Sequence, residues 1–183
     1  MEAREITCCF TGHRKMPPDD TDGIRQRLIQ TIDHLYSEGI TIYYVGGAQG
    51  FDALAAEAVI ERRTALSDLQ LIVVAPHDGH TSRWSPEEQV RYERIRKSAD
   101  DAISLAAHYF RGRMQVRNRY MVDRSSVCVC YLTESKGGTV NTVKYAAKRG
   151  LRIYNLANLT SNFAEKNFKI FFASDSECLP HVL

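Results

Sequence analysis

The chain has 183 residues, of which 44% are hydrophobic and 25% are charged, and its formal net charge is +2. This length fits one domain with a core of its own, and the small positive charge lacks the strong basic excess that is typical of nucleic-acid binders. No apolar run approaches the roughly 20 residues of a membrane span. The N-terminal MEAREITCCF lacks the basic start and long apolar region of a signal peptide, so we expect a cytosolic location.

Short apolar runs alternate with segments of helical periodicity along most of the chain. Residues 6–10 predict a strand, and the apolar spacing within 22–38 predicts a helix that ends before Gly39. The remaining strands are expected at residues 40–45, 69–75, 101–106, 127–132 and 152–156. The remaining helices are expected at about 51–59, 86–99, 113–125 and 139–149.

This alternation predicts an α/β fold, specifically a Rossmann-like three-layer sandwich with a mainly parallel sheet. Residues 69–75 are almost wholly apolar, as expected for a strand that is covered on both faces. We expect one nucleotide-binding domain over residues 1–157. The tail, residues 158–183, is expected to pack on this domain or extend it, with the apolar stretch 168–173 as an edge strand or a packed arm.

Three loops that contain glycine follow predicted strands, at residues 11–15, 46–50 and 135–139. Open parallel sheets bind ligands at the carboxyl ends of their strands. Glycines let the backbone approach an anion closely, and the free N–H groups at a helix N-terminus bind phosphate. Because the three loops converge on one sheet edge and carry basic side chains, we favour an anion site over simple tight turns. Neither GxGxxG nor the P-loop motif is present.

Arg117 is a separate candidate, because it shares a helix face with Met114 and Met121 at spacings of three and four residues. An unpaired guanidinium on an apolar face is costly, so Arg117 requires a carboxylate or a bound anion. The sequence leaves open a structural ion pair, a side chain that reaches out to solvent and a contact with a ligand.

The cysteines and histidines give little indication of a metal site. The five cysteines include no CxxC pair, and in a cytosolic protein they are expected to be reduced and buried. Cys128 and Cys130 alternate along a strand and should face the same side. His77 and His80, in the stretch HDGH, are expected to be surface polar residues because the rest of a ligand set is missing. Trp84 could stack on a base or anchor a lid.

Three motifs together resemble the SLOG superfamily, which includes the LOG phosphoribohydrolases, lysine decarboxylase-like proteins and the DNA-processing protein DprA. The motifs are GGAQGFD at 46–52, the helix motif Met114-x-x-Arg117-x-x-x-Met121, and KGGT at 136–139 followed by Thr142. With Thr11-Gly12-His13-Arg14, the chain most resembles the YpsA branch over about residues 5–156. The resemblance implies a Rossmann-like sheet whose glycine loops hold a nucleotide or a nucleotide-derived ligand.

The chain departs from the LOG enzymes where those enzymes carry their catalytic glutamate, in PGGxGTxxE. No carboxylate follows Thr142 at that spacing, and Asn118 stands where those enzymes have lysine. Cleavage of an N-glycosidic bond passes through an oxocarbenium-like state that a carboxylate stabilises. We therefore expect binding or sensing, and no catalytic residue is assigned. Hydrolysis of a nucleotide N-glycosidic bond is the alternative, and single-stranded DNA binding like that of DprA is the weaker one.

The expected partner is a small phosphate-bearing ligand, for example one like ADP-ribose. We expect no cofactor, no metal and no membrane contact; nucleic acid is not expected, and a homodimer is left open. The residues expected to bind the ligand are Thr11, Gly12, His13, Arg14, Gly46, Gly47, Gln49, Gly50, Asp52, Arg117, Lys136, Gly137, Gly138 and Thr139.

Overall fold

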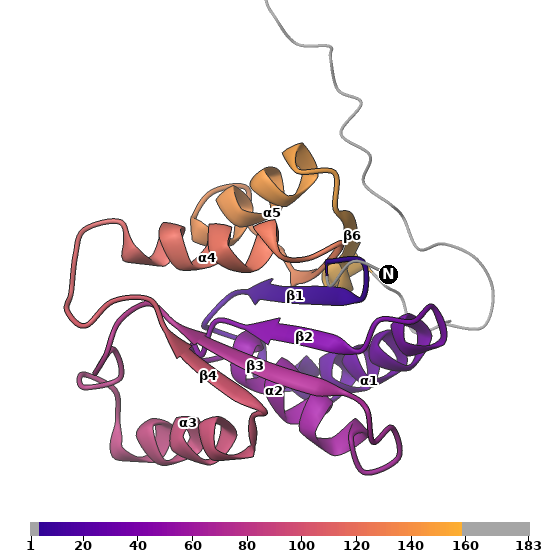
Figure 1. The fold of residues 1–183 in the computed structure, drawn as a ribbon, viewed down its shortest axis with the longest axis horizontal. Coiled ribbons are helices and arrows are strands. Elements are labelled where there is room, and N and C mark those ends of the chain that lie inside the picture. Colours follow the sequence, from indigo (N-terminus) through magenta and orange to yellow (C-terminus); the bar gives the residue numbers. More distant parts are fainter. Residues whose placement is uncertain (1–3, 159–183) are drawn as a thin grey trace, which may run out of the picture.

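A computed structural model describes residues 4–158 of the chain (Figure 1). Six strands alternate with five α-helices and two short 3-10 helices. The strands are β1 (Thr7–Gly12), β2 (Ile42–Val45), β3 (Gln70–Ala75), β4 (Asp101–Ser104), β5 (Val127–Tyr131) and β6 (Arg152–Asn155). The helices are α1 (Thr21–Ser37), α2 (Phe51–Arg62), α3 (Pro86–Ser98), α4 (Arg113–Asp123) and α5 (Gly138–Lys148), with the 3-10 helices Pro18–Asp20 and Leu156–Asn158.

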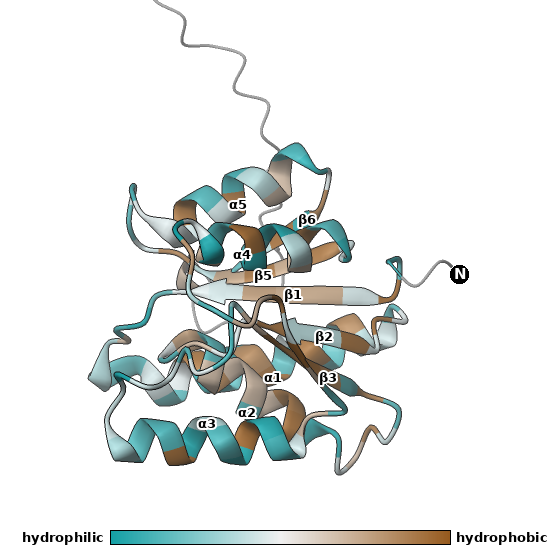
Figure 2. Ribbon diagram, turned by 60° about the vertical axis from the view of Figure 1, so that its left-hand side comes forward, coloured by the Kyte–Doolittle hydropathy of each residue, from teal (hydrophilic) through white to brown (hydrophobic). Residues whose placement is uncertain are grey.

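All strand pairs in the single sheet are parallel, and the strand order is β4-β3-β2-β1-β5-β6. Figure 2 shows α1, α2 and α3 on one face of the sheet and α4 and α5 on the other. The predicted α/β fold, a Rossmann-like three-layer sandwich, is confirmed. The expected tail, residues 158–183, lies outside the described residues apart from Asn158, as does the stretch 168–173.

The apolar core has two parts because successive strand residues point to opposite faces of the sheet. Cys8 and Phe10 of β1 pack with the helices α1 and α2, whereas Cys9 packs with α4 and α5. Cys128 and Cys130 lie together in this second cluster, as their spacing predicts. Burial raises the pKa of Cys130 to about 12, so this thiol is a buried apolar group at neutral pH.

The predicted elements agree with the observed ones to within about two residues at most ends. The strand predicted at 101–106 is shorter, because β4 ends at Ser104. Beyond it, the carbonyl oxygen of Ala106 accepts a hydrogen bond of 2.9 Å from the N–H of Asp78, in the loop after β3. The loops after β3 and β4 are thereby tied together at the carboxyl edge of the sheet.

Candidate functional site

A cavity of 370 Å³ opens at the carboxyl ends of β2 and β3. One wall is the loop between β2 and α2, and the others come from the segment between β3 and α3 and from the start of α4. We call it the arginine cavity, after its charged residues. The lining residues are Arg14, Gly46, Gly47, Ala48, Gln49, Pro76, His80, Arg83, Trp84, Ser85, Arg113 and Met114.

The charge of this cavity is positive. Arg14, Arg83 and Arg113 line it, and its lining contains no aspartate or glutamate. The Arg113 guanidinium lies 3.7 Å from the centre of the Tyr109 ring and donates a 3.5 Å hydrogen bond to the carbonyl oxygen of Phe110. Neither contact neutralises its charge. A recessed surface lined by one sign of charge concentrates ligands of the opposite sign, so the cavity is suited to an anion.

The glycine loop at the base of the cavity is held from behind by Arg117. This buried side chain donates a hydrogen bond to the carbonyl oxygen of Gly46, and its Nη1 lies 3.6 Å from Oδ2 of Asp52. The two side chains are only 5% and 7% exposed, so each buried charge is compensated by the other. Arg117 therefore forms a structural ion pair and does not line the arginine cavity.

Burial raises the pKa of Asp52, and the charge of Arg117 opposes this shift. The backbone N–H groups of Gly46 and Ala48 also favour the ionised carboxylate, as does the charge of Arg14. Since a guanidinium does not lose its proton in proteins, Arg117 stays charged beside this carboxylate. The pair thus fixes the start of α2 and the glycine loop relative to α4.

The opposite wall of the cavity is aromatic. The centre of the His80 ring lies 5.5 Å from the centre of the Trp84 ring and 4.9 Å from that of the Tyr92 ring, and both contacts are edge to face. His80 Nε2 donates a 3.1 Å hydrogen bond to the carbonyl oxygen of Gly47. Burial lowers the pKa of His80, so the neutral ring is favoured there. This contact joins the segment after β3 to the glycine loop, in contrast to the expectation of a surface polar residue.

Four of the predicted site residues line the arginine cavity: Arg14, Gly46, Gly47 and Gln49. Gly50 lines an adjoining cavity between the loop after β1 and helix α3. Asp52 and Arg117 lie behind the loop. Thr11 is buried within β1.

The loop after β5 lies at the same sheet edge but does not line this cavity. The hydroxyl of Thr139 donates a 3.0 Å hydrogen bond to the carbonyl oxygen of Gly12, and the N–H of Thr133 donates one of 3.1 Å to Nε2 of His13. The first and third loops are therefore joined to each other. The side chain of Lys136 and the glycines at 137 and 138 are exposed beside them.

Sequence reasoning missed Arg83 and Arg113 as cavity residues. Both lie outside the glycine motifs: Arg83 is in the long segment after β3, and Arg113 is the first residue of α4, directly after the segment that follows β4. A usable signal existed in the second segment, since residues 102–122 contain arginines and aromatic side chains but no aspartate or glutamate. That pattern indicates a positive surface.

Two other features are absent from residues 4–158. No three histidine, cysteine, aspartate or glutamate side chains gather there in a way that could hold a metal ion. The same part of the chain contains no helix with the length and apolar character that a membrane crossing requires.

Solved structures with a similar fold include two DNA-processing proteins. One is DNA processing protein A from Helicobacter pylori, described for its single-stranded DNA binding mode, with a TM-score of 0.59 and 21% identity over 82% of this chain and 64% of that one. The other is DprA from Streptococcus pneumoniae, with a TM-score of 0.58 and 16% identity over 84% of this chain and 50% of that one. At these identities the likeness shows a shared fold.

Similar sequences come from staphylococci. UPF0398 protein SH1465 of Staphylococcus haemolyticus is 30% identical over 118 residues, which cover 63% of this chain and 61% of the relative. UPF0398 protein SERP1017 of Staphylococcus epidermidis is 28% identical over 108 residues, or 58% and 57% of the two chains. The chain thus spans about three fifths of the length of these curated relatives.

The family comparison covers most of the chain. The family model named YpsA, described as the YspA SLOG family, matches residues 9–162. This range includes β1 from its third residue onward and every strand and helix that follows β1. The chain therefore belongs to the YpsA family of SLOG proteins.

Proposed function

We propose that this protein binds a phosphate-bearing nucleotide or nucleotide-derived ligand in the arginine cavity. The observation that carries the proposal is the combination of Arg14, Arg83, Arg113 and Trp84 in one cavity of 370 Å³ whose lining has no carboxylate. This volume lies within the range of about 300–1,000 Å³ that is usual for small-molecule sites.

Each part of the ligand has a group in the cavity that suits it. Arginine side chains donate paired hydrogen bonds to phosphate oxygens, and the glycine loop allows the ligand close to the backbone. The indole of Trp84 offers a face on which any base can stack. Arg117 contributes indirectly, since it holds the carbonyl group of Gly46 and so keeps the loop in one conformation.

We favour binding of the nucleotide without hydrolysis of its N-glycosidic bond. The carboxylate nearest the glycine loop, Asp52, is engaged by Arg117 and is 7% exposed. Glu88 lines the adjoining cavity, but the arginine cavity itself offers no carboxylate to a developing oxocarbenium ion. An assay for free base released from AMP tests this point, and turnover above about 1 s⁻¹ would overturn it.

Isothermal titration with AMP and UMP tests the proposed site directly. Arg83→Ala and Arg113→Ala should each weaken binding by about 1.5–3 kcal/mol, since each removes a charge-assisted hydrogen bond to phosphate. Arg119→Ala is the matched control, because Arg119 lies on the same helix as Arg113 but outside the cavity lining. Equal effects of all three substitutions, or no binding of nucleotides, would contradict the proposal.

Single-stranded DNA is a second candidate, favoured by the fold shared with a DprA whose described property is single-stranded DNA binding. Stacked bases and phosphates would use the same arginines and Trp84. Competition separates the two: an oligonucleotide of thymidine that binds at least tenfold more tightly than UMP would favour DNA as the ligand. A mononucleotide that binds as tightly as the oligonucleotide favours the small-molecule proposal.

A further inference from the structure

One half of one face of the sheet has no helix over it within residues 4–158. Because β1 to β4 succeed one another in one direction across the sheet, right-handed connections place α1, α2 and α3 on the same face. Figure 1 shows α1 and α2 behind β2, β3 and β4, and no described helix in front of these strands. Parallel sheets are normally covered on both faces, so this half of the sheet lacks a cover.

The uncovered strands present apolar side chains on this face. Tyr44 and Ile72 are register partners on β2 and β3, and both pack against the core cluster under α4 while they remain partly exposed. Ile103 of β4 is the partner of Val74, which belongs to the same cluster. The register therefore places Ile103, which is also partly exposed, on this face.

Helix α4 forms a wall beside these strands. The centre of the Tyr120 ring lies 6.4 Å from that of Tyr44, edge to face. Val116 lies four residues before Tyr120, so it points to the same side of the helix, and it is 48% exposed. We call Tyr44, Ile72, Ile103, Val116 and Tyr120 the uncovered surface. A contiguous apolar patch of this kind marks a place where another segment docks.

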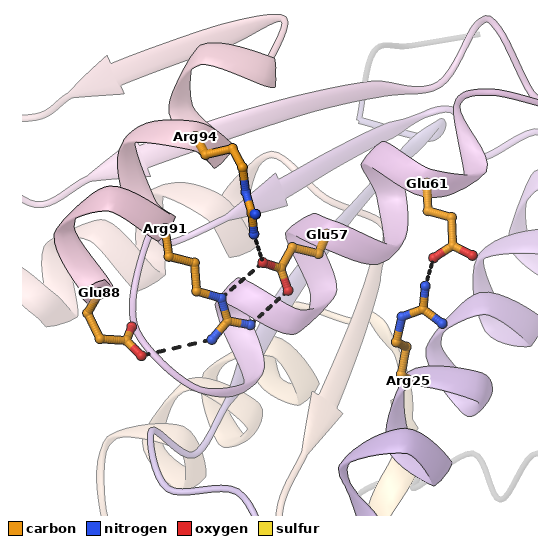
Figure 3. A network of polar contacts seen from close by, with 6 residues as sticks. All are labelled: Arg25, Glu57, Glu61, Glu88, Arg91 and Arg94. Atoms are coloured by element: carbon orange, nitrogen blue, oxygen red, sulfur yellow. Dashed lines mark hydrogen bonds and ion pairs between the residues drawn. The ribbon is translucent and has the colours of Figure 1, made fainter. Parts of the chain in front are cut away.

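A cation without an acidic partner borders this surface. The Arg124 guanidinium lies 3.7 Å from the centre of the Tyr120 ring and donates a 3.3 Å hydrogen bond to the carbonyl oxygen of Tyr120. No carboxylate among residues 4–158 forms an ion pair with it. On the opposite face, by contrast, Arg91 and Arg94 of α3 are both paired with Glu57 of α2, as Figure 3 shows. Arg124 therefore remains available to an acidic group.

The part of the chain outside the described residues has the matching chemistry. Its sequence contains the apolar stretch FKIFFA at 168–173, followed by SDSE at 174–177 with two carboxylates. Both stretches lie beyond residue 162, where the match to the family model ends. Apolar side chains followed by acidic ones suit an apolar surface that is bordered by a cation.

The chain is long enough to reach the uncovered surface. The tail follows β6, which is separated from β3 by four strand spacings, or about 19 Å. The residues between 158 and 168 span up to about 30 Å when extended. A second copy of the chain suits the surface less well, because a symmetric contact would bring the same unpaired cation to both sides.

We propose that residues 168–173 of the same chain pack on the uncovered surface and supply the missing cover of the sheet. The acidic side chains that follow, Asp175 and Glu177, lie beside Arg124. This contact is separate from nucleotide binding, since none of the residues of the uncovered surface lines the arginine cavity.

Amide hydrogen exchange of the full chain, followed by mass spectrometry, tests the contact. Residues 168–173 should exchange at least about tenfold more slowly than in a synthetic peptide of residues 159–183. Val116→Asp should remove most of this protection, because it places a charge in the apolar surface. Val90→Asp is the matched control, since Val90 is 70% exposed on α3, on the opposite face, and it should leave the protection unchanged.

A second pair of variants tests the charge. Arg124→Glu should reduce the protection of residues 168–173 by at least about threefold, because it turns an attraction into a repulsion. Arg119→Glu is its control: the Arg119 guanidinium lies 5.3 Å from the centre of the Tyr145 ring of α5, so it faces away from the uncovered surface. Unchanged exchange in β5 shows that each variant is folded.

Three outcomes would overturn the proposal. Exchange of residues 168–173 as fast as in the peptide would show that the segment does not dock. Protection that survives both Val116→Asp and Arg124→Glu would place the segment elsewhere. Protection that falls on dilution, together with a dimer in size-exclusion chromatography, would show that the segment covers a second copy.

Discussion

The guanidinium of Arg117 fills the space that a side chain at position 46 would need: a Cβ built on Gly46 would lie 1.4 Å from its Nη1. The same Cβ would lie 2.8 Å from Oδ2 of Asp52. Glycine at this position therefore allows a buried ion pair to support the loop that borders the arginine cavity.

Gly46→Ala should displace Arg117 and separate it from Asp52. We expect a loss of about 2–4 kcal/mol in the free energy of unfolding, because both charges stay buried while their contact is broken. Urea denaturation measures the loss. Gly138→Ala is the matched control, since a Cβ there would meet nothing within 4 Å, and it should change the stability by less than about 0.5 kcal/mol. Equal stability of the two variants would show that Arg117 readily moves aside.

Arg117→Ala should make the stability depend on pH through Asp52. Burial raises the pKa of this carboxyl in the folded protein, and the loss of Arg117 raises it further. The folded state then binds more protons than the unfolded state above pH about 4, so the free energy of unfolding falls as pH rises through this window. Relative to the natural protein, we expect a loss of about 3–5 kcal/mol at pH 7.5 and a smaller loss at pH 4.5.

The double variant Arg117→Ala/Asp52→Asn is the control for this prediction. It carries no carboxylate at position 52, so its stability relative to the natural protein should change much less between the two pH values. Urea titrations at pH 4.5 and 7.5 decide the matter. If Arg117→Ala alone lost the same free energy of unfolding at both pH values, Asp52 would not be the group that titrates.

Glu57→Gln should weaken the attachment of α3 to α2. Although burial alone would raise the pKa of Glu57, hydrogen bonds from Arg91 and Arg94 lower it below its ordinary value. A carboxylate with a lowered pKa stabilises the fold above its unfolded pKa of about 4.3, and this contribution is lost as pH falls through the folded value. We expect a cost of about 1–2 kcal/mol at pH 7, and less at pH 4, by urea denaturation.

Glu93→Gln provides the comparison for that variant. Glu93 pairs with Arg96 at the surface of α3, where both side chains are 46% exposed. Surface pairs of this kind contribute between zero and about 1 kcal/mol, so this variant should remain close to the natural protein. If both variants lose the same free energy of unfolding, the partly buried contacts of Glu57 stabilise the fold no more than a surface ion pair does.

Trp84 is the sole tryptophan of the chain and lines the arginine cavity, so its fluorescence should report binding. A base stacked on the indole is expected to quench the emission, and the effect should saturate with AMP concentration. Trp84→Phe should retain a stacking surface but weaken binding by about 1 kcal/mol in calorimetry. Calorimetric binding without any change in emission would place the base away from Trp84.

Much of the fold follows from local sequence patterns. The strand predicted at 127–132 corresponds to β5, and Cys128 and Cys130 share a face because side chains alternate along any strand. Parallel pairing follows from the regular alternation of strands and helices. Helix and strand ends shift by a residue or two because hydrogen bonds such as that between Asp78 and Ala106 depend on contacts that periodicity does not describe.

The site was predictable only in part. Arg14, Gly47 and Gln49 belong to loops that directly follow strands, where the position at the sheet edge is determined by the fold itself. Arg83 comes from a long segment without periodicity, and Arg113 is the first residue of α4, so the position of each at the cavity depends on tertiary contacts. The partner of Arg117 was also undetermined from sequence, since Asp52 lies on another helix on the opposite face of the sheet.

The way in which α3 is attached has a consequence for motion. Within this helix only Tyr92 and Ile95 are buried, and Figure 2 shows most of its residues as hydrophilic. Glu57 of α2 supplies much of the remaining contact through its ion pairs with Arg91 and Arg94. Dissolved salt screens such pairs and weakens them. Amide hydrogen exchange should therefore accelerate with ionic strength in α3 before it does in α1 or α5. Since Trp84 and Ser85 immediately precede this helix, the helix that salt loosens is also the one that would open to admit a ligand.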